Sequence, residues 1–313
     1  MRTIKVLDTF AIPIDKYNIL RALGKVNVFP NIATDKAIIL QRSANANVIV
    51  VNKTKLSAEI VSSFEQVDLI IETATGYDNI DVTAATKCGI AVCNAPAYST
   101  NSVAEHVFTL ILGLSRKLKL CSQQTAQGKW CAEPLLGTEL AGKTIGVVGF
   151  GKIGQAVAKI AQGFSMQIVA YTQHPAKYKK EFPHIEFVNI QELMQRSNIV
   201  SLHIPHTPQT NKFICADILN LMQPGAILIN TARGKIIDEP ALINVAKQQR
   251  INIGLDVLAT EGIAADNELN QLPNVLITPH VGWYTNEAID RLMQIVYDNI
   301  YSFYQGKPIN IVN

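Results

Sequence analysis

The stretch TIGVVGFGKIG, residues 144–154, decides the fold of this chain. An apolar run typical of a buried strand leads directly into a G-x-G-x-x-G pattern, and residues of helical character follow. In this context Gly149 makes the tight turn, Gly151 lets the backbone approach a pyrophosphate, and Gly154 permits close packing of the helix on the strand. The amides of Lys152–Ile153 then face the phosphates at the helix N-terminus. The stretch predicts a dinucleotide-binding unit.

The next predicted strand, Gln167–Tyr171, is followed by Thr172, where NAD-binding units carry an acid for the adenosine ribose. A neutral hydroxyl leaves room for a 2′-phosphate, and His174 and the lysines within 177–180 supply positive charge nearby. Thr172 is also able to hydrogen-bond a ribose, and the lysines fit a solvated helix face equally well. The residues therefore favour NADP(H) and leave NAD(H) open.

Short β-branched runs alternate with helical stretches along the whole chain, which is typical of α/β proteins whose parallel sheets are covered on both faces. The candidate strands of a first series are Ile4–Leu7, Val26–Phe29, Val48–Val51, Leu69–Ile71 and Ile90–Cys93. Those of a second series are Thr144–Gly149, Gln167–Tyr171, Ile199–His203, Ala226–Asn230, Ile253–Leu255 and Val275–Thr278. We therefore predict two Rossmann-like, doubly wound domains, with six strands in the second.

Composition narrows the class of protein. The chain has 313 residues, 48% of them hydrophobic, and 28 Lys and Arg balance 25 Asp and Glu, which excludes a disordered chain and argues against a nucleic-acid partner. The longest apolar run, Val107–Leu114, is too short to span a membrane, and Met1–Asp15 lacks the apolar core of a signal peptide. Five cysteines without a CxxC pair argue against disulfides and a metal site. We expect a cytoplasmic protein.

The segments outside the two series connect them. Ser102–Glu105 has the pattern of a capping box and predicts the start of a long apolar helix that runs to about Cys121. Ser122–Gly142 has no periodicity and contains apolar residues, so we predict an irregular arm. Asn286–Phe303 has apolar residues at helical spacing and is long enough to return to the first domain.

Charged residues follow three strands of the second series. Arg233 comes directly after one strand, Asp256 and Glu261 come after the next, and His280 ends the sixth. Ligands of open α/β sheets bind beyond the carboxyl ends of the strands, so these four side chains are candidates for one active site. Each of them alone fits an ordinary surface residue, but their joint placement points to catalysis.

This set of side chains suits the reduction of a 2-oxo acid. Arg233 can clamp the substrate carboxylate with two parallel donors and polarise the ketone. A protonated His280 can give a proton to the developing alkoxide, and Glu261 would orient the imidazole and stabilise its cation. Asp256 is a candidate for binding the nicotinamide.

At this point the chain resembles the D-isomer-specific 2-hydroxyacid dehydrogenases along nearly its whole length. The motifs that carry the resemblance are the glycine stretch 144–154, Ser201-Leu202-His203-Ile204-Pro205 with Thr210, Leu228-Ile229-Asn230-Thr231-Ala232-Arg233-Gly234, Asp256-Val257 with Glu261, and Thr278-Pro279-His280. The resemblance implies that Arg233, Glu261 and His280 are the catalytic residues. It also implies that the amides of Thr75 and Gly76 hold the substrate carboxylate, and that Lys53 belongs to a neighbouring loop.

The resemblance further implies the domain organisation. Residues 1–100 with 285–313 would form a flavodoxin-like substrate domain, residues 101–284 the dinucleotide-binding domain, and the active-site cleft would lie between them. It also implies a homodimer formed through the helix after Ser102 and the arm that follows.

Within the family, the chain looks most like the glycerate dehydrogenases, also called hydroxypyruvate reductases, through its segments 51–54, 127–130 and 280–283. Trp283 would then line the substrate site or merely pack on the returning helix. His206 departs from the apolar residue of many relatives and either touches the cofactor or faces solvent. The alternative function is that of a dinucleotide-sensing corepressor, which some relatives perform, although the intact Arg, Glu and His set favours an enzyme.

Overall fold

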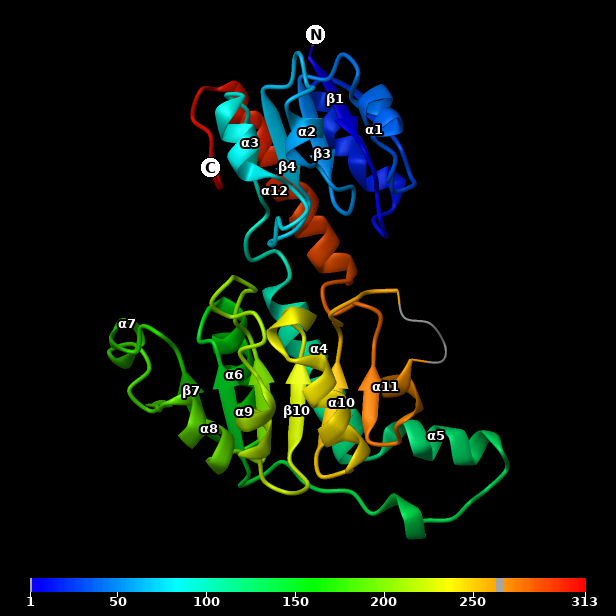
Figure 1. Cartoon of the computed structure of the whole chain (residues 1–313), viewed down its shortest axis with the longest axis vertical. Coiled ribbons are helices and arrows are strands. Elements are labelled where there is room, and N and C mark those ends of the chain that lie inside the picture. The colour runs from blue at the N-terminus through cyan, green and yellow to red at the C-terminus, as the bar shows by residue number, and fades with distance from the viewer. Residues whose placement is uncertain (1, 263–266) are drawn as a thin grey trace. The chain divides into compact units, whose positions relative to one another are not determined.

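A computed structural model describes residues 2–262 and 267–313 and divides the chain into two compact units. The first unit consists of Met1–Ser99 and Tyr284–Asn313, and the second of Thr100–Trp283. Each unit is built on one parallel β-sheet with helices packed against it (Figure 1). The predicted α/β class with two doubly wound sheets is confirmed.

The sheet of the first unit has five strands in the order β2-β1-β3-β4-β5, all parallel. Their bounds are β1 Thr3–Val6, β2 Lys25–Val28, β3 Val48–Val51, β4 Leu69–Glu72 and β5 Ala91–Cys93. Every residue of β3 and β4 is buried, as expected for central strands covered on both faces. The strand order reverses between β1 and β3, so the loops that follow these two strands lie at the switch point where such sheets bind ligands.

The helices of this unit include the returning C-terminal segment. Their bounds are η1 Ile14–Ala22, α1 Lys36–Ser43, α2 Ala58–Val61, α3 Val82–Lys87 and α12 Asn286–Tyr304, where η1 is a 3₁₀ helix. The Thr285 hydroxyl caps α12 by accepting the amide of Ala288 at 3.2 Å. Leu292, Val296 and Ile300 recur at helical spacing on its buried face, and α12 packs on β4 and η1. Helix α12 thus belongs to the first unit.

The sheet of the second unit has seven parallel strands in the order β12-β11-β10-β9-β6-β7-β8. Their bounds are β6 Thr144–Val148, β7 Gln167–Tyr171, β8 Glu186–Phe187, β9 Ile199–Leu202, β10 Ile227–Asn230, β11 Asn252–Leu255 and β12 Val275–Ile277. Six of them are the predicted strands, but the prediction of six was wrong by one. The sequence reading missed β8 because two residues of edge strand carry no alternation. The order reverses between β6 and β9, beside the glycine loop.

Helices cover both faces of this second sheet. Their bounds are α4 Thr100–Ser115, α5 Leu118–Ala126, η2 Glu133–Leu135, α6 Lys152–Gly163, α7 Ala176–Lys179, α8 Ile190–Arg196, α9 Ala216–Asn220, η3 Gly234–Ile236, α10 Glu239–Lys247 and α11 Glu268–Gln271. One core joins α4 and α6 to residues such as Ile145 and Val147 of β6, and another joins α8, α9 and α10 to Val148 and to Leu228 of β10. These two cores fix β6 and its loop from both sides.

The segment between the two series differs from the prediction in three respects. Helix α4 begins at Thr100, so the buried Ser102 lies inside the helix and is not the cap of a capping box. The helix does not run on to Cys121, because the backbone turns at Lys117, whose φ is +51°. The Ser115 carbonyl, at the last residue of α4, accepts the amide of Thr138 at 2.9 Å. The chain after the arm thus returns to the C-terminal end of α4. The separate helix α5 then occupies the first part of the predicted irregular arm.

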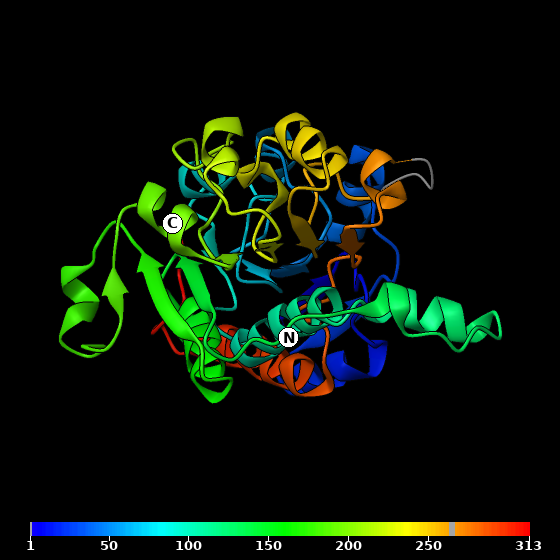
Figure 2. The same cartoon turned by 90° about the horizontal axis from the view of Figure 1, so that it is seen from below.

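The arm carries apolar side chains that its own unit leaves exposed. Figures 1 and 2 show α5 and the residues after it projecting from the body of the second unit. Leu118 is 62% exposed, Leu136 83% and Trp130 95%. No helix among residues 2–262 and 267–313 is both long enough and apolar enough to cross a bilayer.

Candidate active site

The glycine loop follows β6 and has the close contacts that its pattern predicts. Gly149 has φ +99°, and a Cβ there would lie 2.6 Å from the carbonyl oxygen of His203, so only glycine fits. A Cβ on Gly154 would lie 2.1 Å from the Gly149 carbonyl oxygen. These two glycines therefore let the turn and the start of α6 close on the end of β6.

Gly151 differs from the other two glycines because a Cβ there would meet no atom within 4 Å. Gly151 is the N-cap of α6, a helix of 12 residues. Its carbonyl accepts the amide of Gln155, which is the first hydrogen bond of the helix. The amides of Lys152–Ile153 thus have no acceptor inside the helix and point out of its positive end. Open space beside unused amides fits the pyrophosphate of a dinucleotide.

The end of β7 carries Thr172, which is half-buried. Its hydroxyl accepts the backbone amide of His174 at 3.3 Å and so shapes the turn after the strand. Lys177 is exposed and lies over the ring of Tyr178, 5.4 Å from its centre. Thr172 thus stands where an acid would bind the adenosine ribose of NAD. The structure of this turn is compatible with NAD(H) and with NADP(H).

The loop after β9 lies against the glycine turn. A Cβ on Gly149 would come within 2.9 Å of the Ile204 side chain, so Ile204 packs at the predicted cofactor site. Thr210 donates to the Pro205 carbonyl at 2.6 Å and closes the following turn. The His206 ring lies 3.1 Å from the Asn211 side chain. The structure thus gives Thr210 and His206 partners inside their own loop.

His203, at the end of β9, has a titration that matters for stability. Its Nε2 lies 2.9 Å from the Ser201 hydroxyl, and burial lowers the pKa of the imidazole from 6.5 to about 3. Folded protein therefore keeps His203 neutral at every pH at which an unfolded chain would begin to protonate it.

We expect acidification to destabilise the protein through His203. Below pH 6.5 the unfolded chain takes up a proton that the folded chain refuses, so at pH 5 this residue alone lowers the free energy of unfolding by about 2 kcal/mol. The variant His203→Gln should lose about that much less between pH 7.5 and pH 5 in urea unfolding. The exposed His184→Gln serves as control, and an equal pH dependence of His203→Gln and wild type would contradict the expectation.

The loop after β10 presents Arg233 on a rigid turn. The side-chain oxygen of Asn230 accepts the amide of Ala232 at 3.0 Å, and its amide group donates to the Arg233 carbonyl at 2.9 Å. Gly234 lies directly against the loop after β11, because a Cβ there would lie 1.9 Å from the carbonyl carbon of Leu258. The hydrogen bonds of the Asn230 side chain and this close approach hold the Arg233 loop in place.

Thr231 is a further residue of this loop that indicates a ligand at the end of β10. Its hydroxyl oxygen is buried and has no hydrogen-bond partner within the described part of the chain. A buried polar atom costs free energy unless something satisfies it. The position fits a hydroxyl that bonds to a bound dinucleotide.

Asp256, after β11, is a heavily bonded carboxylate. It accepts the Thr278 hydroxyl at 2.6 Å and the amides of Val281 and Gly282 at 2.9 and 2.8 Å, and the His106 ring lies 3.3 Å away. Burial raises the pKa of Asp256, but the hydrogen bonds together outweigh it and hold the pKa below its usual value. Asp256 is therefore ionised and organises the loop after β12.

That loop carries His280, whose Nδ1 lies 2.5 Å from the Glu261 carboxylate. The imidazole is 24% exposed and the Glu261 side chain 45%. His280 has φ +56°, a left-handed backbone conformation that is uncommon for residues other than glycine and that gathers at functional sites. The structure thus brings together two of the three predicted catalytic side chains. The Nδ1 atom of His280 is the one that faces the Glu261 carboxylate.

Trp283 closes the same loop. Its indole N–H donates to the His280 carbonyl at 3.0 Å, and the residue is buried. The contact makes Trp283 a support of the His280 loop, whatever else the side chain touches.

In the first unit, the loops at the sheet's switch point are tied to Asp8. Its buried carboxylate accepts the amides of Lys53 and Thr54 at 3.1 and 2.9 Å. The Lys53 ammonium lies 5.0 Å from the centre of the Phe10 ring. Sequence reasoning missed Asp8, although its position two residues after β1, at the switch point of the sheet, was a usable signal.

The loop after β4 has the amides that the resemblance assigned to substrate. The Thr75 hydroxyl donates to the Ala95 carbonyl at 3.0 Å, and Asn94 donates to the Thr75 carbonyl at 2.7 Å. Among the described residues, the amides of Thr75 and Gly76 have no acceptor. The loop is thus held through its other atoms, and these two donors remain available.

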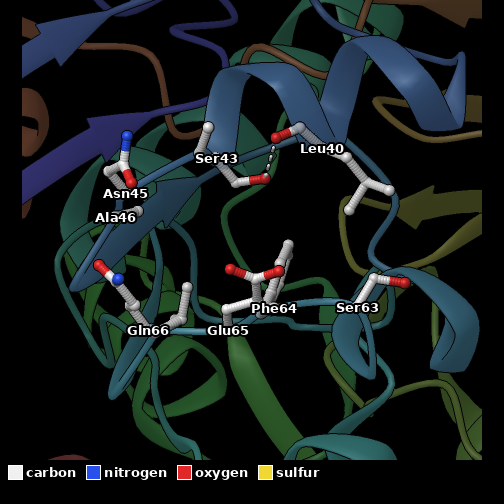
Figure 3. Close-up of a pocket in the computed structure, with 10 residues that line it drawn as sticks. Leu40, Ser43, Asn45, Ala46, Ser63, Phe64, Glu65 and Gln66 are labelled. Carbon is white, nitrogen blue, oxygen red and sulfur yellow. Dashed lines mark hydrogen bonds between the residues drawn. The ribbon is translucent and has the colours of Figure 1, made fainter.

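A cavity of about 290 Å³ lies elsewhere in the first unit (Figure 3). It opens between the end of α1, around Ser43, and the residues before β4, around Phe64 and Glu65. This is the amino edge of the sheet, opposite to the strand ends that carry Lys53 and Thr75. The cavity contains none of the predicted site residues.

Comparisons with known proteins agree with the site. The family model described as "D-isomer specific 2-hydroxyacid dehydrogenase, NAD binding domain" matches residues 108–282. A hydroxypyruvate reductase of Blautia hydrogenotrophica is 34% identical, over 94% of both chains. A glyoxylate reductase of Thermococcus litoralis is 36% identical, over 99% of this chain and 96% of its own length.

A solved structure described as an acyclic imino acid reductase in complex with NADPH and D-Arg covers 99% of this chain and 100% of its own, with 35% identity and a TM-score of 0.90. The family model and this structure between them name both nicotinamide dinucleotides. The glycine loop, the strand order and these matches agree with one another. The chain belongs to the D-isomer-specific 2-hydroxyacid dehydrogenases, a family of NAD-dependent oxidoreductases.

Proposed function

We propose that this protein reduces a small 2-oxo acid to the D-2-hydroxy acid, with hydroxypyruvate and glyoxylate as the foremost substrates. The observation that carries the proposal is the 2.5 Å contact between His280 and Glu261 at the strand ends next to Arg233. The named activities of two relatives, hydroxypyruvate reductase and glyoxylate reductase, support this substrate class.

In this proposal His280 is the acid and base of the reaction. Glu261 holds Nδ1, so Nε2 is the atom that gives a proton to the alkoxide oxygen. The negative charge of Glu261 stabilises the protonated imidazole until that transfer occurs. A reduced nicotinamide, when bound, supplies the hydride for the carbonyl carbon.

Arg233 binds the substrate carboxylate with its planar fork of donors and polarises the ketone. In the first unit, the amides of Thr75 and Gly76 are the proposed donors to a substrate carboxylate, and Lys53 adds positive charge. Trp283 contacts the substrate with the small exposed part of its side chain, in addition to supporting the His280 loop.

For the dinucleotide, the proposal assigns the pyrophosphate to Gly149, Gly151, Gly154 and the amides of Lys152–Ile153. Ile204 and Pro205, with Thr210, line the adenine side, and Thr172 faces the ribose. Thr231, Ala232 and Asp256 hold the nicotinamide part, with the buried Thr231 hydroxyl as the donor or acceptor that gains a partner. NADP(H) is favoured, because Thr172 places no negative charge beside a 2′-phosphate.

One set of assays tests this function. Oxidation of NADH and of NADPH is followed at neutral pH with hydroxypyruvate, glyoxylate and pyruvate, and the chirality of the product is determined. Fast turnover with hydroxypyruvate or glyoxylate supports the proposal. A Michaelis constant for NADPH tenfold or more above that for NADH would overturn the cofactor preference. Tight dinucleotide binding without turnover of any pair would favour a sensing protein instead.

We also propose that the protein is a homodimer formed through α4 and the arm. The exposed Leu118, Trp130 and Leu136 gain from burial against a second copy, since each apolar side chain is worth about 1.5 to 3 kcal/mol when removed from water. Light scattering at micromolar concentration should give the mass of two chains. A monomer at that concentration would refute the dimer, and Trp130→Ser should shift the equilibrium toward it.

A further inference from the structure

His106 is a largely covered polar side chain that the proposed mechanism does not use. It lies on α4, and its side chain is 15% exposed. Its Nε2 is 2.9 Å from the Thr278 hydroxyl and 3.3 Å from the Asp256 carboxylate. Residues far apart in the chain therefore meet below the loop that carries His280.

The direction of these hydrogen bonds follows from the chemistry of the groups. The lowered pKa of Asp256 makes it an ionised acceptor, so the Thr278 hydroxyl must donate its one proton to that carboxylate. The hydroxyl oxygen can then only accept from His106, which places a proton on Nε2 of the imidazole. The chain of donors runs from His106 to Thr278 to Asp256.

Asp256, the last acceptor of this series of hydrogen bonds, also binds the backbone of the His280 loop. The His280 amide donates to the carbonyls of Asp256 and Thr278 at 2.9 and 3.0 Å. The amides of Val281 and Gly282 donate to the Asp256 carboxylate. These bonds surround the one residue of the loop that adopts a left-handed conformation.

The loop also rests directly on the imidazole. A Cβ on Gly282 would lie 3.0 Å from the Asp256 carboxylate and 3.3 Å from Cδ2 of His106. The ring therefore fills the space under Gly282 as well as donating a hydrogen bond. Both contacts are lost together when the side chain is removed.

We propose that His106 is a positioning residue, which acts through Thr278 and Asp256 to hold His280 in the conformation that presents its imidazole to Glu261. This role rests on the proposed function, in which His280 is the proton donor. Of the two, only His280 meets the reacting atoms, and His106 sets where it stands.

The test compares His106→Leu, which keeps the volume and loses the donor, with His106→Gln, which keeps a donor at a similar reach. With saturating cofactor we expect kcat to fall about 10-fold to 30-fold in His106→Leu and by less than threefold in His106→Gln. The exposed His184→Leu is the matched control and should keep wild-type kcat. Equal impairment of the Leu and Gln variants would overturn the proposal, as would a kcat of His106→Leu within twofold of wild type.

A double-mutant cycle separates this role from a general loss of structure and from the proposed function. Because His106 acts through His280, His106→Leu should change the residual kcat of His280→Asn by less than twofold. A full further loss in that background would overturn the proposal, and so would a loss of turnover that a higher dinucleotide concentration restores. If His280→Asn itself keeps wild-type turnover, the proton-donor assignment fails first.

Thr278→Val provides the same test without touching α4. The variant removes the hydroxyl that links His106 to Asp256 and keeps the shape of the side chain. We expect it to lose as much kcat as His106→Leu, and the two changes together should cost no more than either alone. Independent, multiplying losses would overturn the chain of donors, even if His106→Leu proves too unstable to assay.

Discussion

Replacing His280 with Asn is expected to lower kcat for 2-oxo acid reduction by about 10³-fold, within the range of general acid catalysis. The imidazole Nε2 is the proposed source of the proton, and an amide cannot supply one near neutral pH. Asn is the suitable replacement, because His280 has φ +56° and Asn tolerates that conformation better than most residues. The measurement is steady-state turnover with each reduced dinucleotide at saturation.

The binding of the dinucleotide is the control for this variant. His280 follows β12 and the glycine loop follows β6, with three strands between them in the sheet, so the dissociation constant of the reduced cofactor, measured by fluorescence, should stay within threefold of wild type. Glu261→Gln should show a smaller loss in kcat, since it removes the charge behind the imidazole and keeps the proton donor. Turnover of His280→Asn within threefold of wild type would remove His280 from the mechanism.

Replacing Arg233 with Gln is expected to lower kcat/KM by about 10² to 10³-fold, because a buried charged pair loses 2 to 5 kcal/mol when one partner is removed. Both KM and kcat should suffer, since the guanidinium is proposed to bind the carboxylate and to polarise the ketone. Steady-state kinetics over a wide range of oxo acid concentration will separate the two parameters. An unchanged KM would contradict the role in carboxylate binding.

Arg233→Lys tests the geometry of the clamp. Lysine keeps the charge but loses the planar fork that matches a carboxylate, so we expect kcat/KM to lie between the values of wild type and Arg233→Gln. Full activity of the lysine variant would show that charge alone is sufficient. The exact geometry of the loop, which the Asn230 side chain fixes, would then not be required for substrate binding.

Most of the fold could be predicted because local signals and the global pattern agree. The apolar run of β6 and the spacing of Gly149, Gly151 and Gly154 are local signals in the sequence, and the structure forms the strand and the close turn that they predict. The break after α4 could not be predicted, since it depends on the Thr138 amide reaching the Ser115 carbonyl across the arm. Ser102 has a good capping pattern, yet burial of that helix face extends the helix past it.

The candidate site shows the same division. The rule that ligands bind beyond strand ends predicts Arg233, Glu261 and His280 as candidates from the sequence, and the structure brings Glu261 and His280 into contact. It could not find His106, because the hydrogen bond to Thr278 joins residues 172 positions apart and leaves no local trace. Supporting residues of this kind are visible only when their partners are known.

The contact between Gly234 and Leu258 has a consequence for the redesign of this enzyme. Since the two loops touch backbone to backbone, a change in the shape of the loop that carries Arg233 is expected to displace the segment that leads to Glu261. A library that randomises either segment would disturb both residues at once and yield mostly inactive variants. In the proposed function the loops of the first unit around Lys53 and Thr75 bind substrate, so changes in substrate preference are best sought there, apart from the residues proposed for the chemistry.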